Sequence, residues 1–249
     1  MSGQSTAAQR PVGHAPGELA RLQAFVNTLD IEAATEELSS PETLTNWLHA
    51  AGLLDPPGPG APTTDGAPTS WLGTYCRWNG SSGPAMTSTI PDSATTAHLE
   101  TALELREALR GVLRSHVAPL PGDGAPGDGA PRDGAPGDGA PGDGADPLAG
   151  LRRISAGLPT RLEVTADGRI GLAAAGSGVP AALARILLIA ADSATLGTWS
   201  RLKVCSADDC QWAFYDRSPT RSGCWCTMRL CGSRAKSRAY RRRAATPAR

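Results

Sequence analysis

Residues 201–236, RLKVCSADDCQWAFYDRSPTRSGCWCTMRLCGSRAK, contain five of the six cysteines of the chain. Four of them follow the pattern C-x4-C-x15-C-x4-C and are Cys205, Cys210, Cys226 and Cys231. Two close pairs joined by a loop are typical of a tetrahedral metal site, because each pair holds one edge and the loop brings the edges together. Thiolate ligands favour Zn²⁺. The pattern therefore predicts one structural zinc ion, with no coordination position left open for water.

Two other interpretations of the cluster are buried free cysteines and disulfides. Buried free cysteines would be scattered along the chain, and disulfides are rare in the cytoplasm. We expect a cytoplasmic protein, because the chain has no apolar stretch long enough for a membrane span and its start does not resemble a secretory signal. Cys224 is the odd member of the cluster. It could compete as a ligand, act as a free redox-active thiol with a lowered pKa, or have no role.

The net charge of the chain is zero, with 24 Lys and Arg against 24 Asp and Glu, but the charges are separated. Residues 201–249 contain twelve Lys and Arg against three Asp, a net charge of +9, which leaves −9 for residues 1–200. A short segment with this surplus of cations is typical of a polyanion binder. A solvated basic tail that keeps a protein soluble would have the same composition.

The chain from Thr227 to Ala245 contains no proline and predicts a basic helix that begins at the second cysteine pair. Its cations form two stripes at helical spacing, with Arg234, Arg238, Arg241 and Arg242 in the first and Arg229, Lys236 and Arg243 in the second. The apolar side chains between the stripes are predicted to face the zinc core: Met228, Ala235, Ala239 and Tyr240. Three cations near the cysteines are expected to neutralise the −2 charge of a zinc tetrathiolate: Lys203, Arg229 and Arg234. Such a helix suits the phosphates or the major groove of double-stranded DNA, so nucleic acid is the predicted partner.

The rest of the chain divides into folded parts and linkers. Residues 1–17 and 244–249 are predicted to be disordered tails, and residues 18–200 a folded domain. This domain is interrupted by linkers at 55–92 and 120–147, the second of which contains five GDGAP-like repeats. The finger is assigned to residues 201–243.

Hydrophobic periodicity predicts the elements of the front domain. Residues 19–29 have a helical stripe, although 25–28 could also end a short strand. Ser40 and Pro41 mark a helix start, and further helices are predicted over 93–117, from Pro147 and from Pro180. Alternation on both sides of a turn at 166–168 predicts a β-hairpin. The fold class is α+β: a mostly helical N-terminal domain with a small β-hairpin, followed by a small zinc-bound finger that ends in a basic helix.

The cysteine region resembles a known family. R-L-K-V-C-x4-C-x-W-x-F-x-D-x-S at 201–218 and C-W-C-x-M-x-x-C-G-S-R-A-K at 224–236 resemble the CGNR zinc finger family of bacterial proteins. The resemblance implies that the same four cysteines are the zinc ligands. The sequence departs from the family where Ser233 replaces the signature asparagine and where Cys224 stands in place of a basic residue.

The front of the chain is similar to the ABATE domain, which usually precedes this finger. The similar pieces are F-V-N-T at 25–28, S-P-x-x-L-x-x-W-L-x-x-A-G-L-L at 40–54 and L-x-L-R-E-A-L-R at 103–110. The resemblance implies a regulator of transcription induced by stress. Its front domain would sense an unknown small ligand, and Asn27 is the first residue to test for that role or for a structural one.

These observations predict a zinc-dependent, nucleic-acid-binding transcription regulator with a sensing or effector domain in front. The alternative is a zinc-stabilised protein-interaction module, or a module that senses redox state or zinc, that does not bind DNA directly. Its basic helix would then contact acidic partners, among them the acidic front region of the same chain. We expect no enzyme, because no histidine of the chain lies in a nucleophile or metal motif and no glycine-rich phosphate loop follows a strand.

Overall fold

The computed structural model describes most of the chain outside the predicted linkers. The described residues are 13–54, 93–117, 147–164, 166, 168 and 170–245. The linker predicted at 55–92 and the GDGAP-like repeats lie outside them. The predicted disordered tails do so only in part.

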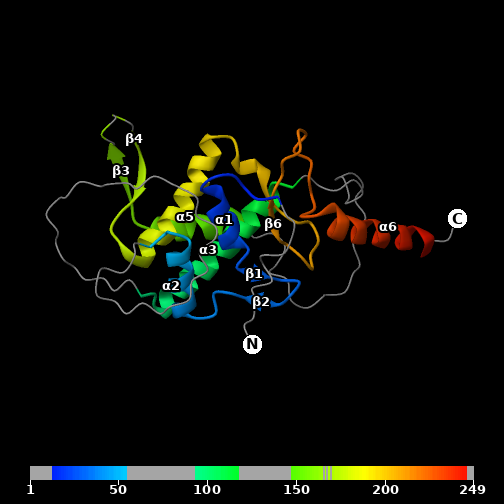
Figure 1. Ribbon diagram of the computed structural model, residues 1–249, viewed down its shortest axis with the longest axis horizontal. Helices are drawn as coiled ribbons and strands as arrows, with labels where there is room; N and C mark the ends of the chain where they lie inside the picture. Colours follow the sequence, from blue (N-terminus) through cyan, green and yellow to red (C-terminus); the bar gives the residue numbers. More distant parts are fainter. Residues whose placement is uncertain are drawn as a thin grey trace.

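In the described part of the chain, five α-helices make up the N-terminal domain (Figure 1). They are α1 (Leu19–Val26), α2 (Pro41–Ala50), α3 (Thr96–Ser115), α4 (Pro147–Gly157) and α5 (Gly178–Thr195). The strands pair into three antiparallel hairpins: β1 (Leu29–Asp30) with β2 (Thr35–Glu36), β3 (Thr160–Val164) with β4 (Ile170–Ala174), and β5 (Leu202–Val204) with β6 (Ala213–Tyr215). A short 3-10 turn, η2 (Trp199–Arg201), leads into β5, and η3 (Met228–Gly232) and α6 (Ser233–Ala245) end the described chain. The predicted fold class is therefore confirmed.

Helix α2 begins as its sequence predicts. The Ser40 hydroxyl accepts a hydrogen bond from the Thr43 N–H at 3.2 Å, and the Thr43 hydroxyl accepts one from the Ser40 N–H at 2.9 Å. This reciprocal capping satisfies two N–H groups that a helix start leaves unpaired, and Pro41 occupies a position that needs no donor. The chain leaves the helix at Gly52, whose φ of +65° is in the left-handed region that glycine adopts without strain.

Helix α5 lies at the centre of the core. Its buried residues include Leu183 and Ile186, which pack against apolar side chains of the other helices. By length and hydropathy alone α5 could span a membrane, but its burial within the fold is that of a core helix. Arg185, which the helical pattern places outward, is half-buried and donates a hydrogen bond to the Leu53 carbonyl at 2.5 Å.

Two local expectations near the start of the chain differ from the structure. The alternative of a strand over 25–28 is wrong, because α1 continues to Val26 and the first strand begins at Leu29. Residues 13–17, assigned to a disordered tail, are placed against the folded unit. The Ala15 N–H donates to Gln23 Oε1 at 2.7 Å, and the Gly13 carbonyl accepts from the Tyr215 N–H at 2.9 Å. These contacts use mainly backbone atoms, so the side chains of the segment do not reveal them.

Helix α3 buries two arginines that its amphipathic pattern places on the outer face. Arg106 and Arg110 are only 3% and 4% exposed. The Arg106 guanidinium donates two hydrogen bonds to Glu36 at 2.7 Å each, and Arg110 donates to the Val26 carbonyl at 2.7 Å. Both arginines thereby attach α3 to the segment between α1 and β2. Both arginines also contact Glu107 of their own helix, at 2.9 and 3.2 Å, so the pairing that the helical pattern indicates is present beside the partners that lie more than 60 residues away.

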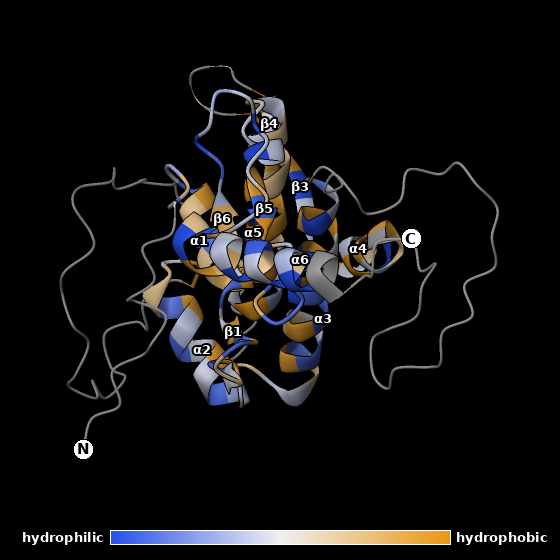
Figure 2. Ribbon diagram, turned by 90° about the vertical axis from the view of Figure 1, so that its right-hand side faces the viewer, coloured by the Kyte–Doolittle hydropathy of each residue, from blue (hydrophilic) through white to orange (hydrophobic). Residues whose placement is uncertain are grey.

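The finger and the helical domain share one hydrophobic core. Leu202, Val204 and Ala213, from β5 and β6, are fully buried in the same cluster as the helices of the front domain. The His116 ring at the end of α3 also forms a hydrogen bond with the Leu202 carbonyl at 2.8 Å. The zinc finger is thus packed onto the helical domain, and α6 lies in front of this packed body when it is viewed along the long axis (Figure 2).

We predict that Glu36→Gln lowers the free energy of unfolding by about 1 kcal/mol at neutral pH, a value reduced for the partial exposure of Glu36. Burial raises the pKa of Glu36, but hydrogen bonds from Arg106 and the Leu38 N–H outweigh it, so the net pKa is lowered. A lowered folded-state pKa means that the stabilisation is complete above the ordinary glutamate pKa and is lost as the pH falls through the folded value. Urea unfolding at several pH values should therefore show the two proteins converging in acid.

Glu18→Gln is the matched control, since Glu18 forms an exposed pair with Arg21 on α1. This variant should unfold like the wild type at every pH. A difference between wild type and Glu36→Gln that is constant down to acid pH would contradict the role assigned to the Glu36 carboxylate.

Candidate functional site

The first cysteine pair lies at the tip of the β5–β6 hairpin. Cys205 follows β5 directly, and its N–H donates to the Trp212 carbonyl at 3.0 Å. The chain then turns so that the N–H groups of Cys210 and Gln211 both donate to the Ala207 carbonyl, at 2.9 and 3.0 Å. Gln211 adopts a positive φ of 47°, which reverses the chain into β6. This turn brings the two thiols of the pair to one side.

The second pair is presented by η3, a short π-helical segment. Cys226 precedes it and Cys231 lies within it. The Thr227 hydroxyl caps its start by accepting a hydrogen bond from the Leu230 N–H at 3.3 Å. The wider i→i+5 turn of a π-helix is a frequent local feature at functional sites. Trp212 and Phe214 are buried beside the cysteines, and Trp225 packs against them, so these aromatic side chains form the small core of the finger.

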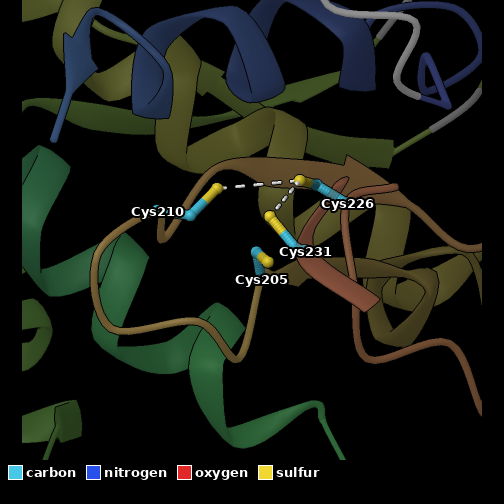
Figure 3. A group of neighbouring side chains, drawn as sticks. All are labelled: Cys205, Cys210, Cys226 and Cys231. Atoms are coloured by element: carbon cyan, nitrogen blue, oxygen red, sulfur yellow. Dashed lines mark hydrogen bonds between the residues drawn. The ribbon is translucent and has the colours of Figure 1, made fainter. Parts of the chain in front are cut away.

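The four predicted ligands converge on one point (Figure 3). The Sγ atoms of Cys205, Cys210, Cys226 and Cys231 all lie within 4.8 Å of one another, and all four residues are buried. The Sγ atom of Cys226 is 3.6 Å from those of both Cys210 and Cys231. A regular ZnS₄ tetrahedron with Zn–S bonds of about 2.3 Å has edges of about 3.8 Å, so the cluster matches the size of one zinc ion.

The protonation of these thiols also fits a cation. Hydrogen bonds from the thiols of Cys210 and Cys226 lower the pKa of Cys205 to about 2. Hydrogen bonds with Cys205 and Cys210 raise the pKa of Cys226. Burial, together with the charge on Cys205, raises the pKa of Cys231 to about 12. Crowded thiolates oppose one another's ionisation, and a bound divalent cation stabilises all four as thiolates. The cluster is a structural zinc site.

A buried ion pair fixes the loop between the two cysteine pairs. Lys203 Nζ donates to Asp216 Oδ2 at 2.9 Å and to the Gly223 carbonyl at 3.1 Å, and it also contacts the Arg221 carbonyl. Asp216 accepts hydrogen bonds from the N–H groups of Ser218 and Gly223 at 2.9 and 2.8 Å. A Cβ at position 223 would lie 2.9 Å from this carboxylate, so glycine permits the close approach. Burial raises the pKa of Asp216, but its hydrogen bonds, led by that from Lys203, lower it far more.

Lys203 therefore has another role than the expected neutralisation of the thiolates. Lys203 is only 1% exposed, and its ammonium group is hydrogen-bonded to the loop that leads to the second cysteine pair. The lysine and the aspartate belong to the quoted motif at 201–218. The sequence signal for their pairing was present in that motif, but the spacing alone did not indicate which groups meet.

Cys224 does not join the metal cluster in the part of the chain that the structure describes. Its carbonyl accepts a hydrogen bond from the Ser206 N–H at 2.9 Å, and its side chain is half-buried. Burial, followed by the negative charge on Cys205, raises the pKa of Cys224. This direction is opposite to the lowered pKa expected for a reactive thiol, because burial outweighs the effect of nearby cations.

Several predicted nucleic-acid contacts share one surface of η3 and α6. They lie around a hollow of about 410 Å³ lined by Arg229, Leu230, Ser233, Arg234, Ser237, Arg238 and Arg241. Lys236 is exposed elsewhere on the helix. Arg242 and Arg243 belong to α6, but their side chains lie outside the described ones. The Ser233 hydroxyl, which replaces the asparagine of the family signature, donates to the Met228 carbonyl at 3.2 Å.

The predicted inner face of the basic helix is partly wrong. Met228 and Tyr240 are 57% and 69% exposed, whereas Ala235 and Ala239 are half-buried. The prediction assumed one continuous α-helix from Thr227. The π-helical turn of η3 changes the rotation per residue before α6 begins, so the faces of the helix shift relative to the zinc core.

Two cations of this surface already contact carboxylates of the same chain. Arg234 Nη1 lies 2.6 Å from Glu32 Oε1, in the turn between β1 and β2. An Arg238 Nη1 atom lies 3.5 Å from Asp209 Oδ2, inside the first cysteine pair. Arg229 and Arg241 have no ion-pair partner among the described side chains. The contact of Arg234 with Glu32 is of the kind that the alternative prediction describes, in which the basic helix contacts the acidic front region of the same chain. Glu32 and, less strongly, the negative charge on Cys231 raise the pKa of Arg234.

Asn27 connects the front domain to the finger. Its amide Oδ1 accepts a hydrogen bond from the Ala213 N–H at 2.7 Å, and its Nδ2 donates to the Ala213 carbonyl at 3.0 Å. Gln23, one turn earlier on α1, also donates to the Ala213 carbonyl at 3.1 Å. The structural alternative for Asn27 therefore has direct support: the side chain pairs with β6 as a neighbouring strand would.

Comparison with known families agrees with this geometry. Residues 201–244 match the model of the CGNR zinc finger. Residues 19–198 match the ABATE model, described as "Putative stress-induced transcription regulator". The chain belongs to the ABATE family. No curated protein is similar enough to match it. Both resemblances noted in the sequence are confirmed, and the zinc cluster of this ABATE protein lies within the matched finger.

We predict that the purified, reduced protein binds one equivalent of zinc per chain and that Cys205→Ser or Cys231→Ser releases it to a mild chelator. Zinc binding supplies on the order of 10 kcal/mol in small zinc domains. Because β5 and β6 belong to the main core, loss of the metal should also lower the melting temperature of the helical domain. Elemental analysis and thermal unfolding by circular dichroism measure the two effects.

Cys224→Ser is the matched control, because this cysteine lies beside the cluster without joining it. It should keep its zinc and its melting temperature. Zinc loss in Cys224→Ser equal to that in Cys205→Ser would contradict the assigned ligand set.

Proposed function

We propose that this ABATE protein is a zinc-dependent transcription regulator that binds double-stranded DNA through η3 and α6. The observation that carries the proposal is the surface around the hollow, where four arginines and two serines lie on one side of the helix. Arginine pairs with phosphate through two parallel hydrogen bonds, and serine hydroxyls also contact phosphate oxygens. We refer to these residues as the basic surface: Arg229, Ser233, Arg234, Ser237, Arg238 and Arg241.

The dimensions of the basic surface suit a nucleic-acid backbone. Arg234 and Arg241 are seven residues apart on α6, which corresponds to about 10 Å along a helix axis. This length matches about three steps of one DNA strand, at 3.4 Å each. The helix also projects from the body of the protein (Figure 1), so a duplex can approach it. The net charge of +9 on residues 201–249 would attract DNA over a longer range.

The zinc site supports a binding role and not a catalytic one. Four protein sulfurs complete a tetrahedral shell, so no position remains for a water molecule that the metal could activate. We therefore infer a protein without enzymatic activity. The reduced thiols that zinc binding needs are available in the cytoplasm, which is the location we propose. A stress signal would act through the front domain.

To test this function, zinc-loaded protein is titrated into a labelled random-sequence duplex and a single-stranded RNA, with fluorescence anisotropy as the readout. We expect duplex binding that weakens steeply with salt, because each phosphate contact releases a counterion. Arg229→Ala and Arg241→Ala should each weaken binding and reduce the salt slope by about one. Chelation of zinc should abolish binding.

The matched control is Arg153→Ala, which removes an exposed arginine from α4 instead of α6. It should bind DNA like the wild type. If the zinc-loaded wild type binds neither duplex nor RNA at low salt, the proposed function is wrong.

A second function is favoured by the ion pairs of Arg234 and Arg238. Since both arginines accept carboxylates as partners, the basic surface could bind an acidic segment of another protein in place of DNA. The two functions make different demands on Glu32. If the basic surface binds DNA, Glu32 competes with phosphate for Arg234 and reduces the affinity for DNA. If the surface binds an acidic protein segment in place of DNA, Glu32 has no effect on the affinity for DNA.

We predict that Glu32→Gln raises the affinity for duplex DNA roughly two- to fivefold, the value of one exposed ion pair. The salt slope should steepen by about one, because Arg234 becomes free to contact phosphate. The same anisotropy titration measures both quantities. Glu18→Gln, which changes an equivalent charge next to α1, should have no effect. Weaker DNA binding by Glu32→Gln would instead mean that Glu32 orients Arg234 for its contact.

A further inference from the structure

The β3–β4 hairpin exposes an uncharged apolar face. Four aliphatic residues of the hairpin are largely exposed: Leu162 (69%), Val164 (65%), Ile170 (70%) and Leu172 (62%). The strand register places Leu162 opposite Leu172 and Val164 opposite Ile170, so all four lie on the same face. A two-stranded hairpin is marginally stable alone, and contiguous apolar patches on a protein surface commonly mark interaction sites.

One edge of this hairpin is available for pairing. The Pro159 carbonyl accepts a hydrogen bond from the Ala175 N–H at 2.9 Å. In an antiparallel pair the bonded residues alternate, so Arg161 and Glu163 direct their backbone groups toward β4. Thr160, Leu162 and Val164 direct theirs away from it. Helix α5 packs along β4, and among the described elements no other strand pairs with β3.

The outer edge of β3 is complementary to itself. If two copies of Thr160–Val164 run antiparallel about a twofold axis at Leu162, each Leu162 pairs with its symmetry mate. Thr160 then pairs with Val164 of the second copy, so the outward-facing backbone groups meet one another and form six hydrogen bonds. Arg161 falls opposite Glu163 of the second copy, twice per dimer. These opposite charges are non-hydrogen-bonded neighbours, the arrangement in which cross-strand side chains lie closest.

We propose that the protein forms a homodimer by pairing β3 with β3 of a second copy. The result is a four-stranded antiparallel sheet in the order β4–β3–β3–β4. Main-chain hydrogen bonds provide the affinity and the Arg161–Glu163 pairs fix the register, as in other cases of strand addition. The aliphatic side chains of the two hairpins then adjoin across the axis, which removes part of the apolar face from water.

The charges that select this register make only exposed contacts within one chain, among them a hydrogen bond from Arg161 Nη1 to the Ala174 carbonyl at 3.0 Å. Within one chain, Arg161 Nη2 lies 3.4 Å from Glu163 Oε1, a long contact between partly exposed groups. The residues opposite them on β4 are Ala173 and Gly171, whose small side chains leave room for the charged groups to reach across the strand boundary. The hairpin also projects at the opposite end of the molecule from α6 (Figure 1), so the dimer leaves the basic surface free. The proposal is independent of DNA binding.

Sedimentation equilibrium of the full, zinc-loaded chain over the micromolar range tests this arrangement. The wild type should show a reversible monomer–dimer equilibrium. Glu163→Arg places Arg161 opposite an arginine, and Arg161→Glu places Glu163 opposite a glutamate. Each single variant should therefore dissociate on the order of tenfold or more readily.

A mixture of the two single variants is the decisive sample. In the mixed dimer every position 161 again faces an opposite charge at position 163, so the two chains should associate with near wild-type affinity. Altered folding of either chain could not be reversed by mixing, and circular dichroism checks that both are folded. A wild type that stays monomeric overturns the proposal. So do single variants that dimerise like the wild type, which would indicate contact through another surface such as the apolar face, and so does a mixture that stays monomeric.

Discussion

Strand β5 is buried on both of its faces, and this burial fixes the finger against the helical domain. Leu202 and Val204 face the core of the helical domain, whereas Lys203 between them faces the loop of the finger. A strand of three residues thus belongs to two cores at once. Successive side chains of a strand point to opposite faces, so three residues are enough to contribute to both cores. Because Cys205 follows β5 directly, fixing this cysteine in the metal site also fixes the position of Leu202 and Val204 in the core of the helical domain.

The buried lysine is compatible with this arrangement only because its charge is fully paired. An unpaired ammonium group would be very costly in the interior. Lys203 instead contacts the Asp216 carboxylate and two backbone carbonyls, which satisfies all three of its donors. Removing one partner of such a pair typically costs about 3–5 kcal/mol. The pair therefore determines where the loop returns toward Cys226, and the metal site depends on it as well as on its four sulfurs.

The turn after α1 is held from both sides, which sets the orientation of the finger on the helical domain. Arg106 and Arg110 of α3 bind the Thr28 hydroxyl, Glu36 and the Val26 carbonyl on one side. On the other side Asn27 and Gln23 bind Ala213 of β6. A displacement of α3 would therefore move the same turn whose side chains are hydrogen-bonded to β6 of the finger. The F-V-N-T and L-R-E-A-L-R pieces of the sequence form one network, and its physical effect is to couple the domains.

Features that depend on local sequence were predicted well. The cysteine pairs are close along the chain, and their spacing indicated the metal cluster; the Ser40–Pro41 start of α2 needs only the adjacent residues. Features that depend on distant partners were not. Nothing in the pattern of α3 shows that Glu36, 70 residues earlier, would bury Arg106. The exposure of Tyr240 was missed because a π-helical turn, which ordinary helical periodicity does not reveal, precedes α6.

Helix α6 derives its direction from contacts in its first two turns and not from an apolar stripe along its length. Its sequence is strongly polar, and a helix that is polar on all sides has no apolar stripe with which to dock on a core. Cys231 enters the metal cluster just before Ser233, and Arg234 contacts Glu32 one residue further on. Arg238 contacts Asp209 one turn later, so three anchors define the axis and hold the arginines of the helix at fixed relative positions. A flexible basic tail would attract a polyanion equally strongly but would lose more conformational entropy on binding. The value of the metal is therefore to supply this rigidity where the sequence provides almost no hydrophobic surface.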